Sequence, residues 1–209
     1  MSDSIQAALE RAQALLFDLD GTLIDSSGST RRAWSAFADR HGLDRGEVLA
    51  YVQGKPSGES TRELSPEGSD LELEARLVEE AEVNDTEGIV PHAGAAAALA
   101  SDKKVAIVTS CTDDLARARI GASGLPRPEV VITADRIENG KPDPEAFLLG
   151  AKELEVAPED CIVFEDAPAG VKAGKAAGAF VIALRTTHPE ETLEDADVIV
   201  DDLSAVFGS

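Results

Sequence analysis

The chain has few of the residues that build disulfides or zinc sites. Among its 209 residues are two cysteines, one methionine, one tryptophan and one tyrosine. Cys111 and Cys161 are far apart in the sequence and have no histidine cluster near them, so the sequence predicts neither a zinc site nor a disulfide. Cys161 opens an apolar run and is expected to be a buried small residue. We expect the same of Cys111, although it follows a predicted strand end, where a reactive thiol is the alternative.

Long apolar runs are also missing. No segment approaches the roughly 18 apolar residues that a membrane-spanning helix needs. Residues 1–13 lack the basic and apolar regions of a secretory signal. The sequence therefore predicts a cytoplasmic protein.

Basic residues are scarce relative to acidic ones. The chain has 19 Lys and Arg against 40 Asp and Glu, which gives a formal net charge of −21. Such a field repels a polyphosphate backbone, which argues against nucleic acid as a partner. It also repels a small phosphate ester, so a phosphate site here would need a metal ion or a lysine to offset the charge.

Hydrophobic residues are present in ordinary amounts, at 43% of the chain, with 28% charged residues. This composition predicts a folded core rather than disorder, and the length fits one large domain or a core with a modest insertion. Apolar, strand-like runs recur, and we expect strands that end at Phe17, Ser110, Thr133, Asp166, Leu184 and Val200. Helix-like segments of about a dozen residues lie between most of them. The alternation predicts an α/β fold with a doubly wound, Rossmann-like parallel sheet.

Polar side chains lie at or directly after the ends of several of these predicted strands. Because right-handed crossovers place the carboxyl ends of parallel strands at one edge, these side chains should meet there. The residues concerned are Asp18, Thr109, Ser110, Glu165 and Asp166.

One interval breaks the alternation. Residues 27–91 contain no comparable strand-like run and read as helices, with Trp34 expected in their core. We expect a core domain of residues 1–26 and 92–209, and a mobile helical cap domain of residues 27–91. The hinges should lie near residues 25–28 and 89–94.

The run FDLDGTLIDS holds the most informative pair, Asp18 and Asp20. One carboxylate can attack a phosphorus atom and the other can handle the proton of the leaving oxygen, provided that a divalent cation offsets their repulsion. The alternative is an acidic turn, because Asp and Gly are ordinary turn residues.

Four short motifs occur in a fixed order: FDLDGTLIDS, VTS ending at Ser110, GKPDP from Gly140, and FEDAPAG from Phe164. In this order they resemble the haloacid dehalogenase superfamily, in the helical-cap branch that contains β-phosphoglucomutases and bacterial sugar and hexitol phosphatases. The resemblance covers nearly the whole chain. Members that cleave carbon–halogen bonds lack a carboxylate at the position of Asp20, so the resemblance favours a phosphoryl substrate.

The resemblance implies a role for each candidate residue. Asp18 would be the nucleophile that forms an aspartyl-phosphate, and Asp20 the general acid and base. Mg²⁺ would be held by the Asp18 side chain, the Asp20 backbone carbonyl and Asp166. Glu165 would lie behind these ligands or contact the ion through a water molecule. The phosphate-binding residues would be Thr109, Ser110 and Lys141.

Each role has a simpler alternative. Glu165 and Asp166 could be acidic residues at a helix N-terminus, and both readings can hold together. Lys141, between Gly140 and Pro142, could be an exposed turn lysine, and Thr109 an ordinary strand residue. Lys55 is a candidate for substrate contact from the cap, with a solvated loop lysine as the alternative.

The sequence favours a magnesium-dependent phosphatase of small phosphorylated sugars or polyols, as a monomer or a homodimer. A β-phosphoglucomutase is the alternative, but Thr30 stands where mutases carry a histidine, and Pro56-Ser57 replaces their Ser-Arg pair. A non-enzymatic phospho-aspartate receiver is a further alternative. Receivers are shorter, lack a helical cap, and carry their acidic pair before the nucleophile strand.

Overall fold

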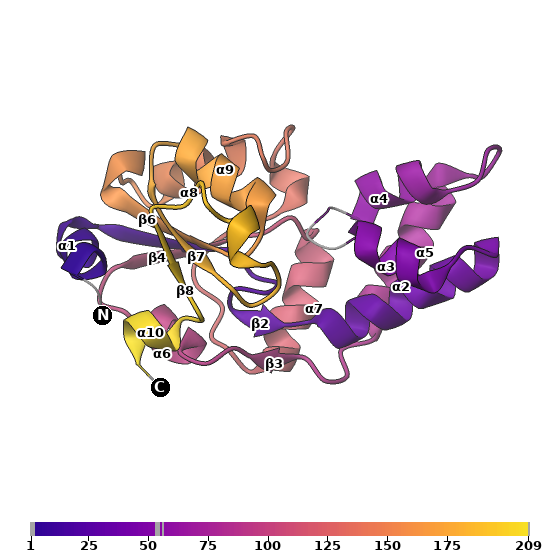
Figure 1. Ribbon diagram of the computed structural model, residues 1–209, viewed down its shortest axis with the longest axis horizontal. Coiled ribbons are helices and arrows are strands. Elements are labelled where there is room, and N and C mark those ends of the chain that lie inside the picture. The colour runs from indigo at the N-terminus through magenta and orange to yellow at the C-terminus, as the bar shows by residue number, and fades with distance from the viewer. Residues whose placement is uncertain (1–2, 53–54, 56, 209) are drawn as a thin grey trace.

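The computed structural model describes residues 3–52, 55 and 57–208, which form an α/β unit and a helical unit side by side (Figure 1). Within the described residues, six parallel strands form the main sheet in the order β5-β4-β1-β6-β7-β8. Their bounds are β1 Ala14–Phe17, β4 Lys104–Val108, β5 Val130–Ile132, β6 Cys161–Glu165, β7 Phe180–Leu184 and β8 Val198–Val200. The predicted doubly wound fold is confirmed.

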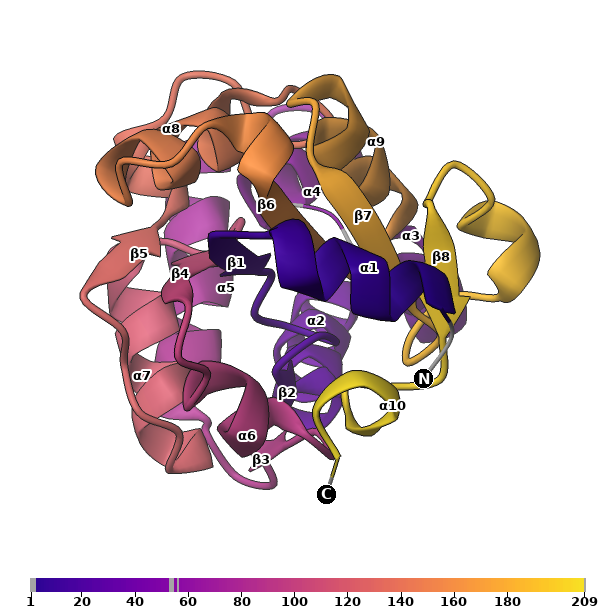
Figure 2. The ribbon, with the colours of Figure 1, turned by 90° about the vertical axis from the view of Figure 1, so that its left-hand side faces the viewer.

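Helices cover both faces of this sheet (Figure 2). One face carries α1 (Asp3–Arg11), α6 (Ala95–Leu99), α7 (Asp113–Ser123) and α10 (Ser204–Phe207). The other carries α8 (Glu145–Glu153) and α9 (Pro168–Ala176). Because side chains alternate along a strand, Leu15 and Phe17 of β1 enter the first core and Ala14 and Leu16 the second. Short 3₁₀ turns at Ala134–Arg136, Pro158–Asp160 and Glu190–Thr192 connect the elements.

The helical unit has a core of its own. It consists of α2 (Ser27–His41), α3 (Arg45–Val52), α4 (Ser57–Leu64) and α5 (Leu71–Asn84). Trp34 and Phe37 pack with Val48, Val52 and Val78 in a cluster separate from the two sheet cores, as expected for Trp34. Asp70 caps α5 by accepting a 3.1 Å hydrogen bond from the Leu73 amide, which satisfies an otherwise unpaired helix donor.

The two segments that join the units pair with each other. The strands β2 (Ile24–Asp25) and β3 (Val90–Pro91) form a short antiparallel ribbon that the sequence does not predict. Two-residue strands carry no readable periodicity, which explains the omission. No helix among the described ranges is both long and apolar enough to cross a membrane.

Candidate active site

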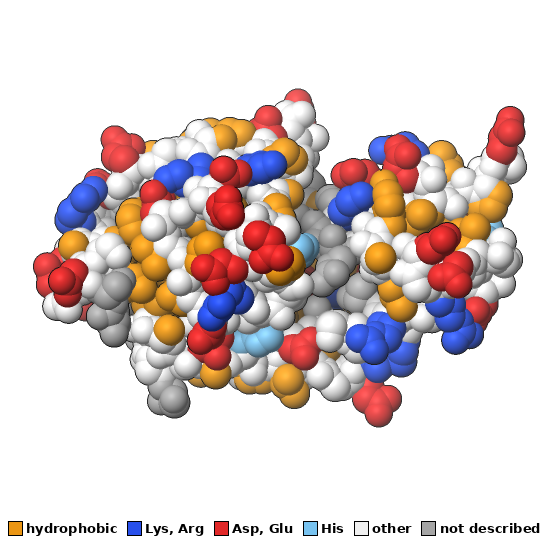
Figure 3. Space-filling view, in the orientation of Figure 1, with side chains coloured by type: hydrophobic (Ala, Val, Ile, Leu, Met, Phe, Trp, Pro, Cys, Tyr) orange, Lys and Arg blue, Asp and Glu red, His pale blue; other side chains and the backbone are white. Residues whose placement is uncertain are grey.

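A cavity of about 770 Å³ lies between the carboxyl edge of the sheet and the helical unit. Figure 3 shows the hollow between the two units on one face of the molecule. The cavity lining includes every candidate residue of the sequence analysis, namely Asp18, Asp20, Lys55, Thr109, Ser110, Lys141, Glu165 and Asp166. The predicted convergence at the sheet edge is therefore observed, while the chemical role of each residue stays a prediction.

Three buried carboxylates form the floor of this cavity. Asp18 directly follows β1, and its amide donates a 3.0 Å hydrogen bond to the Phe164 carbonyl of the adjacent strand β6. Asp18 therefore lies beside Glu165 and Asp166, and ligand oxygens of the three carboxylates lie within 4.8 Å of one another. Burial raises the pKa of Asp18 well above its usual value, with Lys141 opposing the shift. Burial, followed by the charge of Glu165, raises the pKa of Asp166 to about 7.

A hard divalent cation fits this donor set. The oxygens of Asp18, Glu165 and Asp166 are the ligand type that Mg²⁺ prefers. A cation there would also offset the mutual repulsion of these carboxylates.

Lys141 lies against the same carboxylates, with its side chain only 6% exposed. Its ammonium is 2.6 Å from Asp18 Oδ1 and 2.6 Å from Glu165 Oε1, and it donates a 3.0 Å hydrogen bond to the Val108 carbonyl. Burial alone lowers the pKa of Lys141, but the charges of Asp18 and Glu165 outweigh it and raise this pKa above the usual value. Lys141 is thus a buried cation and not an exposed turn lysine.

The backbone at the start of α9 holds Glu165. Its Oε2 accepts 3.0 Å hydrogen bonds from the amides of Asp166 and Ala167. The interpretation of Glu165 as an acidic residue at a helix N-terminus therefore holds, since its side chain accepts from amides at the start of α9, and the same side chain faces Lys141. Hydroxyls of Thr22 and Thr187 donate to the two oxygens of Asp166 and restrain it.

Thr109 and Ser110 follow β4 at the cavity wall. The buried Thr109 hydroxyl accepts a 3.1 Å hydrogen bond from the Cys111 amide, which rigidifies the turn after the strand. Burial, followed by the charge of Asp20, raises the pKa of the Cys111 thiol well above its usual value. Cys111 is thus a buried thiol whose surroundings disfavour the thiolate, which agrees with the expected small buried residue.

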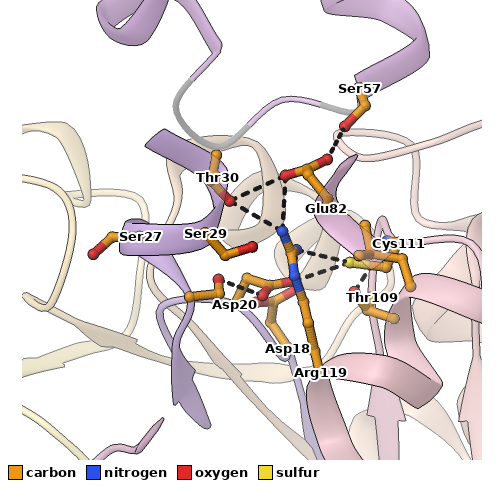
Figure 4. Close-up of polar contacts among 12 residues, drawn as sticks. Asp18, Asp20, Ser27, Ser29, Thr30, Ser57, Glu82, Thr109, Cys111 and Arg119 are labelled. Atoms are coloured by element: carbon orange, nitrogen blue, oxygen red, sulfur yellow. Dashed lines mark hydrogen bonds and ion pairs between the residues drawn. The ribbon is translucent and has the colours of Figure 1, made fainter. Parts of the chain in front are cut away.

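Asp20 lies at the centre of a polar network (Figure 4). Its Oδ1 accepts a 2.6 Å hydrogen bond from Ser26, and its Oδ2 a 3.0 Å hydrogen bond from the Cys111 thiol. Arg119 of α7 forms a 2.9 Å ion pair with Oδ2 and a 2.8 Å ion pair with Glu82 of α5. Sequence reasoning missed Arg119 and Glu82.

A signal for Arg119 existed in the sequence. Arg119 lies on the apolar face of α7 with Leu115, Ala116 and Ile120, and a charged residue on such a face requires a buried partner. The sequence did not indicate which partner, because Glu82 belongs to a different unit.

Lys55 lines the cavity from the helical unit. Its ammonium lies 3.4 Å from the centroid of the Tyr51 ring, and the side chain is exposed. Pro56, the substitution that separates this loop from the mutase pattern, lies outside the described residues.

Comparison with known proteins gives one consistent result. The family model of haloacid dehalogenase-like hydrolases matches residues 12–178. Over 202 residues the chain is 45% identical to hexitol phosphatase A of Escherichia coli K12, with 94% of each chain covered. It is 40% identical over 200 residues to validoxylamine A 7′-phosphate phosphatase of Streptomyces hygroscopicus subsp. limoneus, covering 91% of this chain and 94% of the relative.

A solved structure shares the same fold. The crystal structure of CbbY from Rhodobacter sphaeroides in complex with phosphate superposes with a TM-score of 0.80 at 25% identity, and the match covers 92% of this chain and 95% of the other.

Proposed function

The chain belongs to the haloacid dehalogenase-like hydrolases, and from this premise we propose that it is a magnesium-dependent phosphatase of small phosphorylated sugars or polyols, such as hexitol and hexose phosphates. The observation that carries the proposal is the buried contact of Lys141 with Asp18, beside Glu165 and Asp166. One cation among three carboxylates leaves a site that is short of positive charge. Such a site suits a divalent cation together with a phosphoryl group. The sugar and polyol phosphatases among its relatives support the substrate class.

Asp18 is the proposed nucleophile. Its carboxylate oxygen forms a bond to phosphorus while the bond from phosphorus to the sugar oxygen breaks, and this gives an aspartyl-phosphate that water then hydrolyses. Bound Mg²⁺, held by Asp18, Asp166 and the Asp20 carbonyl, would supply the charge that lets a carboxylate approach a phosphate dianion. Lys141 neutralises part of the same charge and keeps Asp18 in place.

Asp20 is the proposed general acid and base. It donates a proton to the leaving alkoxide and afterwards removes one from the attacking water, a contribution of about 10²–10⁴-fold in comparable enzymes. Thr109 and Ser110 lie on the cavity wall, where hydroxyl and amide donors can bind the non-bridging oxygens.

The helical unit is proposed to act as the cap, within residues 27–91, over a core of residues 1–26 and 92–209. Its separate hydrophobic cluster and its connection through β2 and β3 support this division. Lys55 is the proposed cap contact to the sugar or polyol, because it lines the cavity and is exposed.

The test is phosphate release, with Mg²⁺, from a panel of phosphorylated hexoses, hexitols, pentoses and glycerol. We expect turnover of at least one member, and loss of that turnover when a chelator replaces Mg²⁺. The Asp18→Asn variant is the matched control for contaminating phosphatases. Absence of phosphate release from the whole panel would refute the proposal, and conversion of β-glucose 1-phosphate with a bisphosphate primer would favour a mutase.

A further inference from the structure

Arg119 connects the two units at the edge of the cavity. Its side chain is 5% exposed and its two terminal nitrogens face different partners (Figure 4). Nη1 lies 2.9 Å from Asp20 Oδ2 and 3.3 Å from the Cys111 sulfur. Nη2 lies 2.8 Å from Glu82 Oε1 and 3.0 Å from the Thr30 hydroxyl. The guanidinium therefore pairs with one carboxylate of the α/β unit and one of the helical unit.

The two oxygens of Asp20 differ in their partners, because only one of them is paired with the guanidinium. Oδ2 forms the ion pair with Arg119 and accepts a hydrogen bond from the Cys111 thiol, so the positive charge lies against this oxygen. Among the described residues Oδ1 accepts one hydrogen bond, of 2.6 Å, from Ser26. Oδ1 therefore keeps one position open for a proton.

We propose that Arg119 is the positioning residue of Asp20, which makes Oδ1 the atom that carries the transferred proton. This role rests on the phosphatase function proposed above. As the alkoxide leaves, the bond between Oδ1 and its proton breaks and the proton joins the sugar oxygen. In the second half, the water that attacks phosphorus loses a proton to the same Oδ1.

Glu82 holds the other side of the guanidinium. It lies buried on α5, and its Oε2 accepts a 3.0 Å hydrogen bond from Ser57 of α4, while Oε1 accepts from Thr30 of α2. Three helices of the helical unit thus contribute to holding Arg119. The orientation of Asp20 consequently depends on a docked helical unit, and Glu82 acts through Arg119 rather than on the substrate.

The test uses a variant in which no buried charge is left alone. Arg119→Met by itself would leave Glu82 buried without its partner, so the informative protein is the double variant Arg119→Met/Glu82→Gln. Glu82→Gln alone is an intermediate variant, since it keeps the contact between Arg119 and Asp20 but weakens the hold on the other side of the guanidinium. Arg127→Met is the control, because it breaks only a surface pair with Asp113.

The measurement compares kcat and KM for the best sugar or polyol phosphate of the panel and for p-nitrophenyl phosphate. The aryl oxygen leaves without protonation, so turnover of this substrate does not depend on proton donation by Asp20. In the double variant we expect kcat to fall about 10²-fold for the sugar phosphate and less than about threefold for the aryl phosphate. Arg127→Met should keep the ratio of the two activities within about threefold of the unaltered protein, and Glu82→Gln should change this ratio less than the double variant does.

A second comparison separates positioning from general structure. In an Asp20→Asn background, the double substitution should lower sugar-phosphate turnover no further, because the group that Arg119 positions is already lost. A further loss in that background, or equal losses on the two substrates, would overturn the role of Arg119. If the unaltered protein released no phosphate, both the proposed phosphatase function and the role of Arg119 would be refuted. If the unaltered protein were active and the double variant kept the same ratio of sugar-phosphate to aryl-phosphate activity, only the role of Arg119 would be refuted.

Discussion

The ammonium of Lys141 lies 2.6 Å from Oδ1 of Asp18, although 123 positions separate the two residues. Asp18 follows β1, and Lys141 lies on the loop before α8. Both loops leave the same edge of a parallel sheet, which is why distant residues meet there.

Replacement of Asp18 by Asn should abolish phosphate release without unfolding the protein. The amide cannot form the proposed phosphoryl bond, and it removes one of three clustered buried carboxylates, so stability should hold or rise. Phosphate release and thermal unfolding by circular dichroism test this. Turnover at the unaltered rate would contradict the assignment of Asp18 as nucleophile.

Replacement of Lys141 by Met should lower both stability and activity. Asp18 and Glu165, which have 10% and 2% exposed side chains, would lose their shared cation. We expect a loss of about 3–5 kcal/mol in the free energy of unfolding and a fall in kcat of at least about 10²-fold. Denaturant unfolding and phosphate release measure the two effects.

Lys175→Met is the matched control for Lys141. It breaks an exposed 2.6 Å pair with Asp197 and should cost under about 1 kcal/mol. Equal destabilisation by the two variants would contradict the account of Lys141 as a buried counter-charge.

The raised pKa of Asp166 predicts a pH-dependent stability in the presence of a chelator. Its pKa rises from the usual 3.8 to about 7 on folding, so between these values the unfolded chain is ionised while the folded carboxyl keeps its proton. The unfolded state then binds fewer protons, and stability falls as pH rises through this window by up to about 1.4 kcal/mol per pH unit. Mg²⁺ binds the ionised carboxylate, so it should stabilise the protein more at about pH 8 than at about pH 5.

Thermal unfolding with chelator or with Mg²⁺, at both pH values, tests this prediction. The Asp166→Asn variant should show a flatter pH dependence and a smaller response to Mg²⁺. If this variant kept the full pH dependence of stability and the full stabilisation by Mg²⁺, Asp166 would be ruled out as the origin of the two effects.

Replacement of Gly21 by Ala should impair Mg²⁺-dependent turnover. Gly21 has φ +87°, and an added methyl group would overlap the Asp166 carboxylate and Thr187. Gly124 is the matched control, since it has φ +73° and no heavy atom within 4 Å of an added methyl group.

Both alanine variants should lose about 1–2 kcal/mol of stability from backbone strain. Only Gly21→Ala should also raise the Mg²⁺ concentration needed for half-maximal phosphate release. Similar Mg²⁺ dependence in the two variants would show that Gly21 matters for its backbone alone.

The alternation of strands and helices could be read from local periodicity, and so could most of the site. Asp18, Thr109 and Glu165 each lie at or directly after the end of a buried strand, and the parallel fold brings all such ends together. Not every helix reaches the expected dozen residues, since α6 has only five and begins after Gly94, whose φ is +83°. The ribbon of β2 and β3 was not predictable, since its pairing joins segments on either side of the helical unit.

The fold class, the place of the helical segment and the acidic residues at the sheet edge could be predicted from the amino-acid sequence alone. These depend on periodicity and on the order of strand ends, which are local properties of the chain. The burial of Lys141 between Asp18 and Glu165, and the connection that Arg119 makes from Asp20 to Glu82, are visible only in the folded protein. The packing of the helices determines which buried charges pair across the two units. Long side chains reach partners that are distant in the sequence, and the spacing of residues along the chain does not identify these partners.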